Sequence, residues 1–119
     1  METIVMAFGK VELTDEALDT VASLFRSLGE VTRLKLLRML ESGEMSVGEM
    51  ANNIDTSQAN VSKHLKVLIE AGVLSRRAQG TSAFYSIGDP IILKICDTVC
   101  DDMTQKMKSK AAGFGLKVK

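Results

Sequence analysis

The sequence predicts a mainly α-helical fold with one small β-hairpin, in the element order α-α-α-α-β-β-α. Three observations support this prediction. Apolar residues recur with a helical period along most of the chain, capping residues stand at the start of three predicted helices, and two β-compatible runs flank Gln79-Gly80-Thr81. A chain of 119 residues suits one domain. We therefore expect a single domain over residues 1–110 and a mobile C-terminal tail over residues 111–119.

Two helices are predicted in the first third of the chain. Thr14 is a candidate N-cap for the first helix, and Gly29 is a plausible end for it. The second helix is expected to begin near Glu30 and to end before Gly43. The apolar positions of the first helix follow a helical period and are Ala17, Leu18, Val21, Leu24, Phe25 and Leu28.

Two shorter helices are predicted next. Ser46 and Glu49 have the spacing of a capping box, in which each side chain satisfies a free backbone N–H of the other residue. This box predicts a helix that ends near residue 53, and a further helix is predicted over residues 57–71. The tight connection over residues 54–56 makes the pair a helix-turn-helix pattern.

A hairpin and a last helix complete the prediction. The β-compatible runs cover residues 73–78 and 82–87. Asp89-Pro90 indicates the start of the last helix, because Asp caps a helix and Pro suits its first position, where no N–H is needed. We expect this helix to end near Lys110.

The charge is balanced in total but not along the chain. Fifteen Lys and Arg oppose fifteen Asp and Glu, which argues against a protein that coats nucleic acid indiscriminately. Residues 1–62 carry a net charge of −5, residues 63–88 carry +3 and residues 89–119 carry +2. The basic middle segment is therefore the place where a polyanion is expected to dock.

Composition excludes several other classes of protein. Two cysteines are too few for a disulfide scaffold, and no apolar run approaches the ~18 residues of a membrane span. The first residues lack a basic region followed by an apolar core, so we expect a soluble, cytoplasmic protein with no membrane partner. Asp55, Ser57, Ser62 and His64 lie on one helix and turn, which is not a triad geometry, so no enzyme is expected.

Four segments read LGEVTRLKLL over residues 28–37, SVGEMA over 46–51, SQANVSKHLKVLIEAG over 57–72 and FYSIGDP over 84–90. Together they resemble the ArsR/SmtB family of bacterial repressors, and the resemblance covers roughly residues 14–105. It implies a winged helix-turn-helix fold, with the hairpin as the wing, and a homodimeric, sequence-specific repressor that an inducer releases from its operator DNA. In one departure, Glu30-Val31 replaces the family's usual Asp-Pro, so the start of the second helix is less well specified.

The resemblance also implies a dimer formed by the first and last helices. On the last helix, the apolar stripe runs on through Cys96 and Met107, and little else in the sequence would cover it. The candidate interface residues are Leu18, Val21, Phe25, Ile92, Ile95, Val99 and Met103.

The helix over residues 57–71 has one apolar and one polar face. Val61, Leu65 and Leu68 fall on a stripe that must face the core. The opposite face is slim at its start and basic, as a helix entering a major groove needs to be, although a solvated face would have the same composition. The residues expected to contact DNA, with those of the wing included, are Ser57, Gln58, Ala59, Ser62, Lys63, Lys66, Arg77, Gln79 and Thr81.

Individual residues have competing interpretations. Gln58 could bond a base edge, whereas the lysines would mainly neutralise phosphates. Arg76 and Arg77 could hold a phosphate or enter a minor groove, and the alternative for each is a strand arginine exposed to solvent. His64, the chain's one histidine, falls beside the core stripe, and we expect a packed, hydrogen-bonded structural residue.

The inducer site is the least specified feature. The family's thiol site at the helix-turn-helix is absent, because Ser46 and Gly48 fill its cysteine positions, and the last helix has no histidine for a zinc site of histidines and carboxylates. Cys96 and Cys100 remain, at a spacing that can supply two ligands to one ion. They could be packing residues, a sensor of a thiol-reactive species or of a soft ion of the arsenite, cadmium, zinc or copper class, or a redox switch between subunits.

Two alternatives to this function stay open at the level of the sequence. One is a winged-helix dimer that regulates without a metal. The other is a protein-interaction module on the same fold that has lost DNA binding, for which no salt-dependent affinity for duplex DNA is expected.

Overall fold

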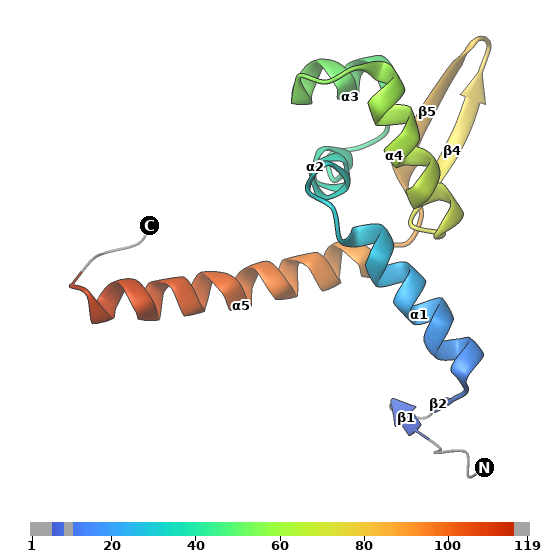
Figure 1. The fold of residues 1–119 in the computed structure, drawn as a ribbon. Helices are drawn as coiled ribbons and strands as arrows, with labels where there is room; N and C mark the ends of the chain where they lie inside the picture. The colour runs from blue at the N-terminus through green and yellow to red at the C-terminus, as the bar shows by residue number, and fades with distance from the viewer. Residues whose placement is uncertain (1–5, 9–10, 116–119) are drawn as a thin grey trace. The chain divides into compact units, whose positions relative to one another are not determined.

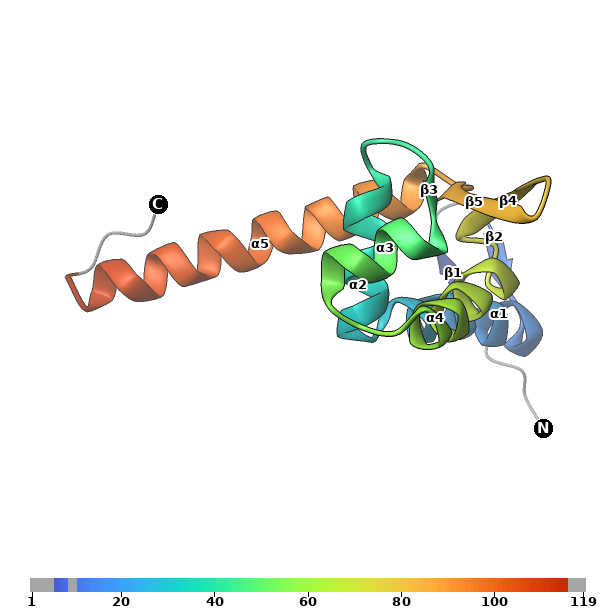
Figure 2. The same cartoon turned by 90° about the horizontal axis from the view of Figure 1, so that it is seen from above.

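The computed structural model of the chain describes residues 6–8 and 11–115. Contacts divide the chain into two compact units, Met1–Gly88 and Asp89–Lys119, which we describe separately. Within the described residues, the first unit contains four helices and five strands, and the second contains one helix (Figures 1 and 2). The mainly α-helical fold with a small hairpin is therefore confirmed.

The first two helices begin at side-chain caps. α1 spans Asp15–Leu28 and α2 spans Val31–Leu40. The Thr14 hydroxyl accepts the Ala17 N–H at 3.1 Å, as predicted. Glu30 caps α2, because its carboxylate accepts the Arg33 N–H at 2.9 Å. At the start of α2, this acidic cap takes the place of the family's usual Asp-Pro.

The next two helices form the expected pair. α3 spans Val47–Ile54 and α4 spans Gln58–Glu70. The capping box is present, with both Ser46–Glu49 hydrogen bonds at 3.2 Å. Between the helices, Asp55 adopts a left-handed conformation with φ of 50°, which ends α3 and turns the chain toward α4.

A three-stranded antiparallel sheet follows, in the order β3-β5-β4. The predicted hairpin is β4 (Leu74–Gln79) and β5 (Ser82–Ile87), and the Gln79–Ser82 pair closes it. Gly80 has a φ of 60° in the turn, a conformation that glycine adopts without steric cost. β3 (Met45–Ser46) adds a third strand that was not predicted, since two residues are too few to show a period.

A second small hairpin also lies outside the predicted elements. β1 (Met6–Phe8) pairs with β2 (Val11–Leu13) in an antiparallel arrangement. The signal that could have predicted it is the Gly9-Lys10 dipeptide between two short β-compatible runs, since Gly-X is a common two-residue hairpin composition.

The core of the first unit lies between α2, α3, α4 and the start of β4. Its central side chains are at most 2% exposed, and burying each contributes roughly 1.5–3 kcal/mol. The predicted stripe on α4 is part of this core, which fixes the opposite face of α4 toward solvent. The core side chains are Leu36, Leu37, Leu40, Met50, Val61, Leu65, Leu68 and Val73.

The second unit is a single long helix in the part of the chain that the structure describes. α5 spans Ile91–Gly113, and the Asp89 carboxylate accepts the Ile91 N–H at 3.1 Å. The predicted end at Lys110 is three residues too early, so Ala111–Gly113 belong to the helix and not to a tail. Residues 116–119 lie outside the described part of the chain. Among the described helices, none is long and apolar enough to cross a membrane.

Candidate nucleic-acid interface

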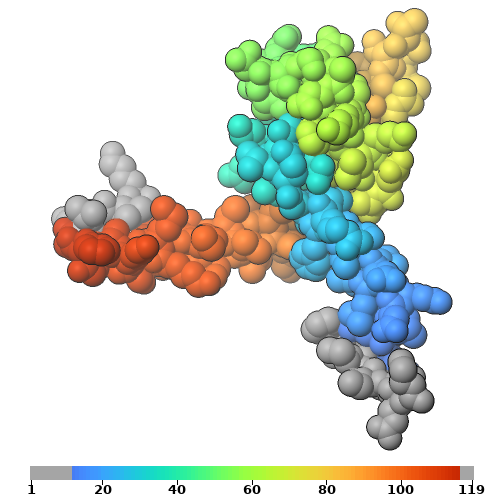
Figure 3. All heavy atoms as spheres, in the orientation of Figure 1, coloured from blue at the N-terminus to red at the C-terminus, as the bar shows by residue number. Residues whose placement is uncertain are grey.

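The polar face of α4 is exposed, and the structure brings its predicted residues together. Val61, Leu65 and Leu68 are fully buried on the other side of the same helix. The Ser57 hydroxyl accepts the Asn60 N–H at 3.1 Å, so it has a capping role at the start of α4. The exposed residues are Gln58, Ala59, Ser62, Lys63 and Lys66, together with Ser57 itself. Figure 3 shows α3, α4 and the wing gathered at one end of the first unit.

A groove of about 390 Å³ joins the start of α4 to the wing. Gln58 contributes from α4, Arg76 and Thr81 contribute from the wing, and the first residues of α3 form another wall. A side chain at Gly48 would contact the Gln58 amide, since its Cβ would lie 3.5 Å from Nε2. The predicted residues Gln58 and Thr81 therefore share one concave surface, and Arg76 shares it with them.

The two wing arginines lie on opposite faces of the sheet. Arg76 pairs with Tyr85 and Arg77 pairs with Phe84 across the ladder, and neighbouring pairs alternate between faces. Leu74, two residues before Arg76, is buried, so Arg76 is on the face that turns toward the core and α4. The strand period in the sequence could have identified this face, but of the two arginines we named as candidates only Arg77 entered the predicted set of DNA contacts.

Arg77 is held by its own neighbours. Its Nε and Nη2 donate to Glu44 at 3.2 and 2.6 Å, and its Nη1 donates to the Gln79 side-chain carbonyl at 2.8 Å. The guanidinium also lies 5.0 Å from the centre of the Phe84 ring. Hydrogen bonding to Arg77 lowers the pKa of Glu44, and the same pair raises the pKa of Arg77.

His64 has the structural role that the sequence predicted. It is 8% exposed, and its Nδ1 lies 3.2 Å from Nη1 of Arg33. Because an arginine can only donate, this contact is a hydrogen bond in the tautomer whose Nδ1 accepts and whose proton is on Nε2. Glu30 Oε2 lies 3.7 Å from the same nitrogen.

The two cysteines are one turn apart on α5. Cys96 is half-buried and Cys100 is exposed. Within the described residues, no group of three or more His, Cys, Asp or Glu side chains could hold a metal ion. The two cysteines therefore lie at the predicted helical spacing, and the described residues place no third His, Cys, Asp or Glu with them in such a group.

The predicted interface residues differ in exposure. Val21 and Phe25 of α1 are 38% and 54% exposed, and Val99 and Met103 of α5 are 56% and 51% exposed. Leu18 and Ile95 are half-buried. Ile92, by contrast, is buried within the chain at 1% exposure and offers no surface to a second chain.

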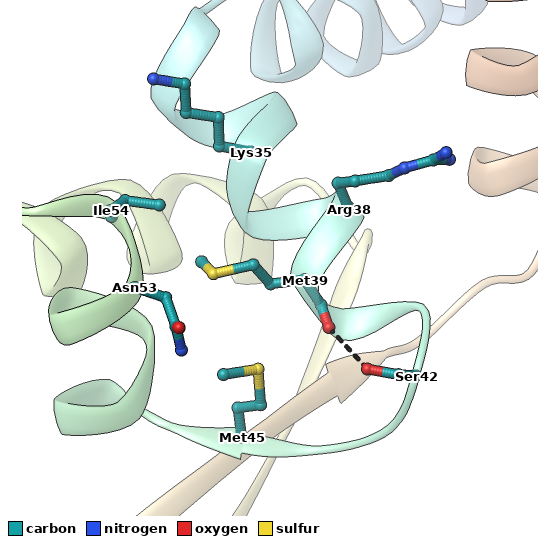
Figure 4. Close-up of a pocket in the computed structure, with 7 residues that line it drawn as sticks. All are labelled: Lys35, Arg38, Met39, Ser42, Met45, Asn53 and Ile54. Atoms are coloured by element: carbon teal, nitrogen blue, oxygen red, sulfur yellow. Dashed lines mark hydrogen bonds between the residues drawn. The ribbon is translucent and has the colours of Figure 1, made fainter.

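A hollow of about 520 Å³ lies beside α2, outside the predicted contact set. Figure 4 shows the thioethers of Met39 and Met45 extending into it, whereas the charged ends of Lys35 and Arg38 point outward. Ser42 donates to the Met39 carbonyl at 3.2 Å. A small-molecule site requires several polar groups that point toward one place, and the side chains of this hollow do not provide them.

An exposed basic helix held by a helix-turn-helix and flanked by a wing defines a winged helix-turn-helix DNA-binding domain. The sequence model of the arsR family of bacterial regulatory proteins matches residues 30–76. An uncharacterized HTH-type transcriptional regulator of Methanocaldococcus jannaschii is 34% identical over 85 residues, covering 71% of this chain and 96% of that protein. The chain belongs to the ArsR family and is a DNA-binding transcriptional regulator, not an enzyme.

Two further proteins are similar to this chain. A protein of Streptomyces lividans named "probable mercury resistance operon repressor" is 43% identical over 72 residues, which cover 60% of this chain and 58% of that protein. The homodimeric winged helix-turn-helix DNA-binding domain of Mycobacterium bovis superposes with a TM-score of 0.73 at 24% identity, over 82% of this chain and 93% of that one. The second likeness shows the fold.

Proposed function

We propose that this protein is a homodimeric repressor that binds a near-palindromic operator, with α4 of each protomer in the major groove. The observation that carries the proposal is the exposed polar face of α4, opposite three fully buried side chains. Gln58 and Ser62 on that face are suited to base edges or phosphates, and Lys63 and Lys66 are suited to phosphates. Two such helices related by a two-fold axis would read half-sites about one helical turn, ~34 Å, apart.

The wing adds a second contact in this proposal. Arg76 and Thr81 line the same groove as Gln58, so a duplex that meets α4 also meets this face of the wing. Arg77 and Gln79 remain proposed contacts, but they bond to each other, and Arg77 also bonds to Glu44. Arg76 is therefore the wing arginine that we expect to contribute more to affinity.

Dimerisation through α1 and α5 supplies the two-fold axis. Val99, Met103 and Met107 are each more than half exposed along α5, and Phe25 is equally exposed on α1. Large apolar side chains gathered on a helix in this way typically mark an interaction surface. The M. bovis domain with the same fold is homodimeric, which supports a second copy of this chain as the partner.

We propose Cys96 and Cys100 as the place where an inducer acts. Two thiols one turn apart can bind one soft ion, and a dimer would offer four sulfurs, enough for a tetrahedral site if the two helices cross closely. The S. lividans relative is named for mercury resistance, and mercury is a thiophilic metal. A disulfide between subunits would use the same pair as a redox switch.

A selection experiment tests the proposal. The purified protein is mixed with synthetic duplexes carrying a randomised centre of ~21 base pairs, about two helical turns, and the retained duplexes are sequenced. An enriched inverted repeat, bound with an affinity that falls steeply between about 50 and 200 mM salt, is the expected result. No enrichment and no salt-dependent binding would instead favour a protein-interaction module that has lost DNA binding.

A further inference from the structure

Arg33 connects three helices of the DNA-binding unit. Its Nε donates to the Ser27 carbonyl at 2.6 Å and its Nη2 donates to the Arg26 carbonyl at 3.1 Å, so it caps the end of α1. Its third donor, Nη1, reaches Nδ1 of His64 on α4. The guanidinium of this α2 residue therefore fixes α4 relative to the end of α1.

His64 lies at the centre of the proposed reading helix. It directly follows Ser62 and Lys63, two residues of the exposed face, yet its own ring is buried. A rotation or shift of α4 about this ring would move both of those side chains relative to a bound duplex. Groups that bind DNA need to be held within about 0.5 Å of their productive geometry.

We propose that Arg33 and His64 are positioning residues for DNA binding, and that protonation of His64 breaks their hydrogen bond and weakens operator binding. A proton on Nδ1 uses the lone pair that accepts from Arg33, so a donor then faces a donor and two cations lie 3.2 Å apart. The inference rests on the proposed binding of DNA by α4.

The surroundings of the ring favour a change of partner on protonation. Glu30 Oε2 lies 3.7 Å from Nδ1 and could accept the new N–H once the ring moves toward it. The backbone hydrogen bond from Arg33 lowers the pKa of Glu30, so this carboxylate is ionised throughout the range in which histidine titrates. Among the described residues that line the groove beside Arg33, Arg26 of α1 and Glu70 of α4 are also charged.

The chain offers a clean test because His64 is its one histidine. Affinity for a duplex retained in the selection above is measured by fluorescence anisotropy from about pH 8 to 5.5. We expect binding by the wild-type protein to weaken by about tenfold as the pH falls, a factor that corresponds to roughly 1.4 kcal/mol.

Three variants separate a positioning role from a merely structural one. In His64→Asn, the amide oxygen takes the place of Nδ1 as an acceptor that does not titrate, so affinity should stay near the wild-type value and no longer depend on pH. His64→Ala lacks the acceptor and should bind more weakly at every pH, again without the pH dependence. Arg33→Lys keeps the charge but loses the three-way donor geometry, and should resemble His64→Ala.

A measurement on the wild-type protein alone guards against variants that fail to fold. Nitrogen-15 NMR of the single imidazole should show the proton on Nε2 at neutral pH in the free protein. By linkage, added duplex DNA should oppose protonation of the ring, because protonation opposes binding.

The outcomes are distinguishable. Wild-type and His64→Asn proteins with the same pH profile, or a ring proton on Nδ1, would overturn this inference while the proposed function stands. A wild-type protein that binds no duplex at any pH would overturn both.

Discussion

Arg77 and Glu44 form a two-point ion pair, in which the guanidinium meets both carboxylate oxygens at 3.2 and 2.6 Å. The pair ties the first strand of the wing to the residue before β3, across the outer face of the sheet. Both side chains are about half exposed, so water screens the attraction and its effect on stability is small. The pair also matters for the proposed function, because it places the carboxylate of Glu44 beside an arginine that was predicted to contact DNA.

Removing the charge of Glu44 should strengthen DNA binding. Glu44→Gln releases Arg77 for a phosphate and withdraws an anion from the neighbourhood of the duplex, so we expect about two- to fivefold tighter binding. The measurement is an anisotropy titration at fixed salt. Glu41→Gln is the matched control, because it removes the same charge from the exposed Arg38–Glu41 pair. Equal effects of the two variants would assign the gain to net charge and not to Arg77.

The same pair should contribute to the acid sensitivity of the fold. Because Arg77 lowers the pKa of Glu44 below its ordinary value of 4.5, the folded state binds the proton less readily than the unfolded state. The contribution of the pair to folding stability is therefore complete above the ordinary pKa of Glu44. It is lost as the pH falls through the lower pKa that Glu44 has in the folded state. Urea unfolding at several acidic pH values should show a slightly shallower loss of stability for Glu44→Gln. A steeper loss for the variant would contradict this sign.

Substitutions of the two wing arginines should differ in their effects on DNA affinity. Arg76 lines the groove with Gln58, whereas Arg77 is occupied by Glu44 on the other face. Arg76→Ala should weaken binding about tenfold, the loss expected for one charged contact, and Arg77→Ala should weaken it less. The comparison is internally controlled, because both variants remove one positive charge from the same strand. A greater loss for Arg77→Ala would show that the pair with Glu44 opens on DNA.

Substitutions of Gln58 and Lys63 should weaken DNA binding in different ways. Gln58→Ala removes a proposed base contact, so it should lower the preference for the selected sequence over a scrambled duplex by about 1–3 kcal/mol. Lys63→Ala should lower the affinity for both duplexes alike. It should also reduce the salt dependence of binding by the equivalent of about one phosphate contact. Lys35→Ala, an exposed lysine of α2, is the control for loss of charge. Circular dichroism should show unchanged folding, and unchanged affinity of all the variants would contradict the assignment of this face.

The sequence was sufficient to predict those elements that repeat an apolar pattern over many residues or begin at a recognisable cap. Thr14 and Ser46 each accept the N–H that their position predicts, because a capping bond is local and needs no knowledge of the rest of the fold. The stripe of Val61, Leu65 and Leu68 was equally readable, since these apolar residues recur at helical spacing along α4. Two- and three-residue strands were missed because they form through a partner strand and leave almost no pattern of their own.

Pairings between distant residues could not be predicted from the sequence. Nothing local in Arg77 indicates Glu44, which is 33 positions away, and nothing in His64 indicates Arg33. The sequence marked His64 as packed because it lies beside an apolar stripe, but the identity of its partner depends on how α2 crosses α4. The site residues on α4 followed from periodicity, while the choice between Arg76 and Arg77 needed the orientation of the sheet.

The cysteine pair on α5 should be needed for the inducer response but not for DNA binding. A Cys96→Ser, Cys100→Ser protein keeps the shape of both side chains, replaces each thiol with a more polar hydroxyl, and loses the thiolate that a soft ion requires. We therefore expect it to bind the selected duplex with wild-type affinity. Mercuric ion, cadmium ion or the oxidant diamide should release the duplex from the wild-type protein and not from this variant.

The single substitutions show which chemistry is at work. If two thiols of one chain bind an ion, either Cys96→Ser or Cys100→Ser alone should weaken the response strongly. If a disulfide between subunits is the switch, non-reducing electrophoresis should show a covalent dimer after oxidation, and the exposed Cys100 is the thiol that an oxidant reaches more easily. Release of the duplex from the double variant by all three reagents would show that the pair is a packing feature of α5.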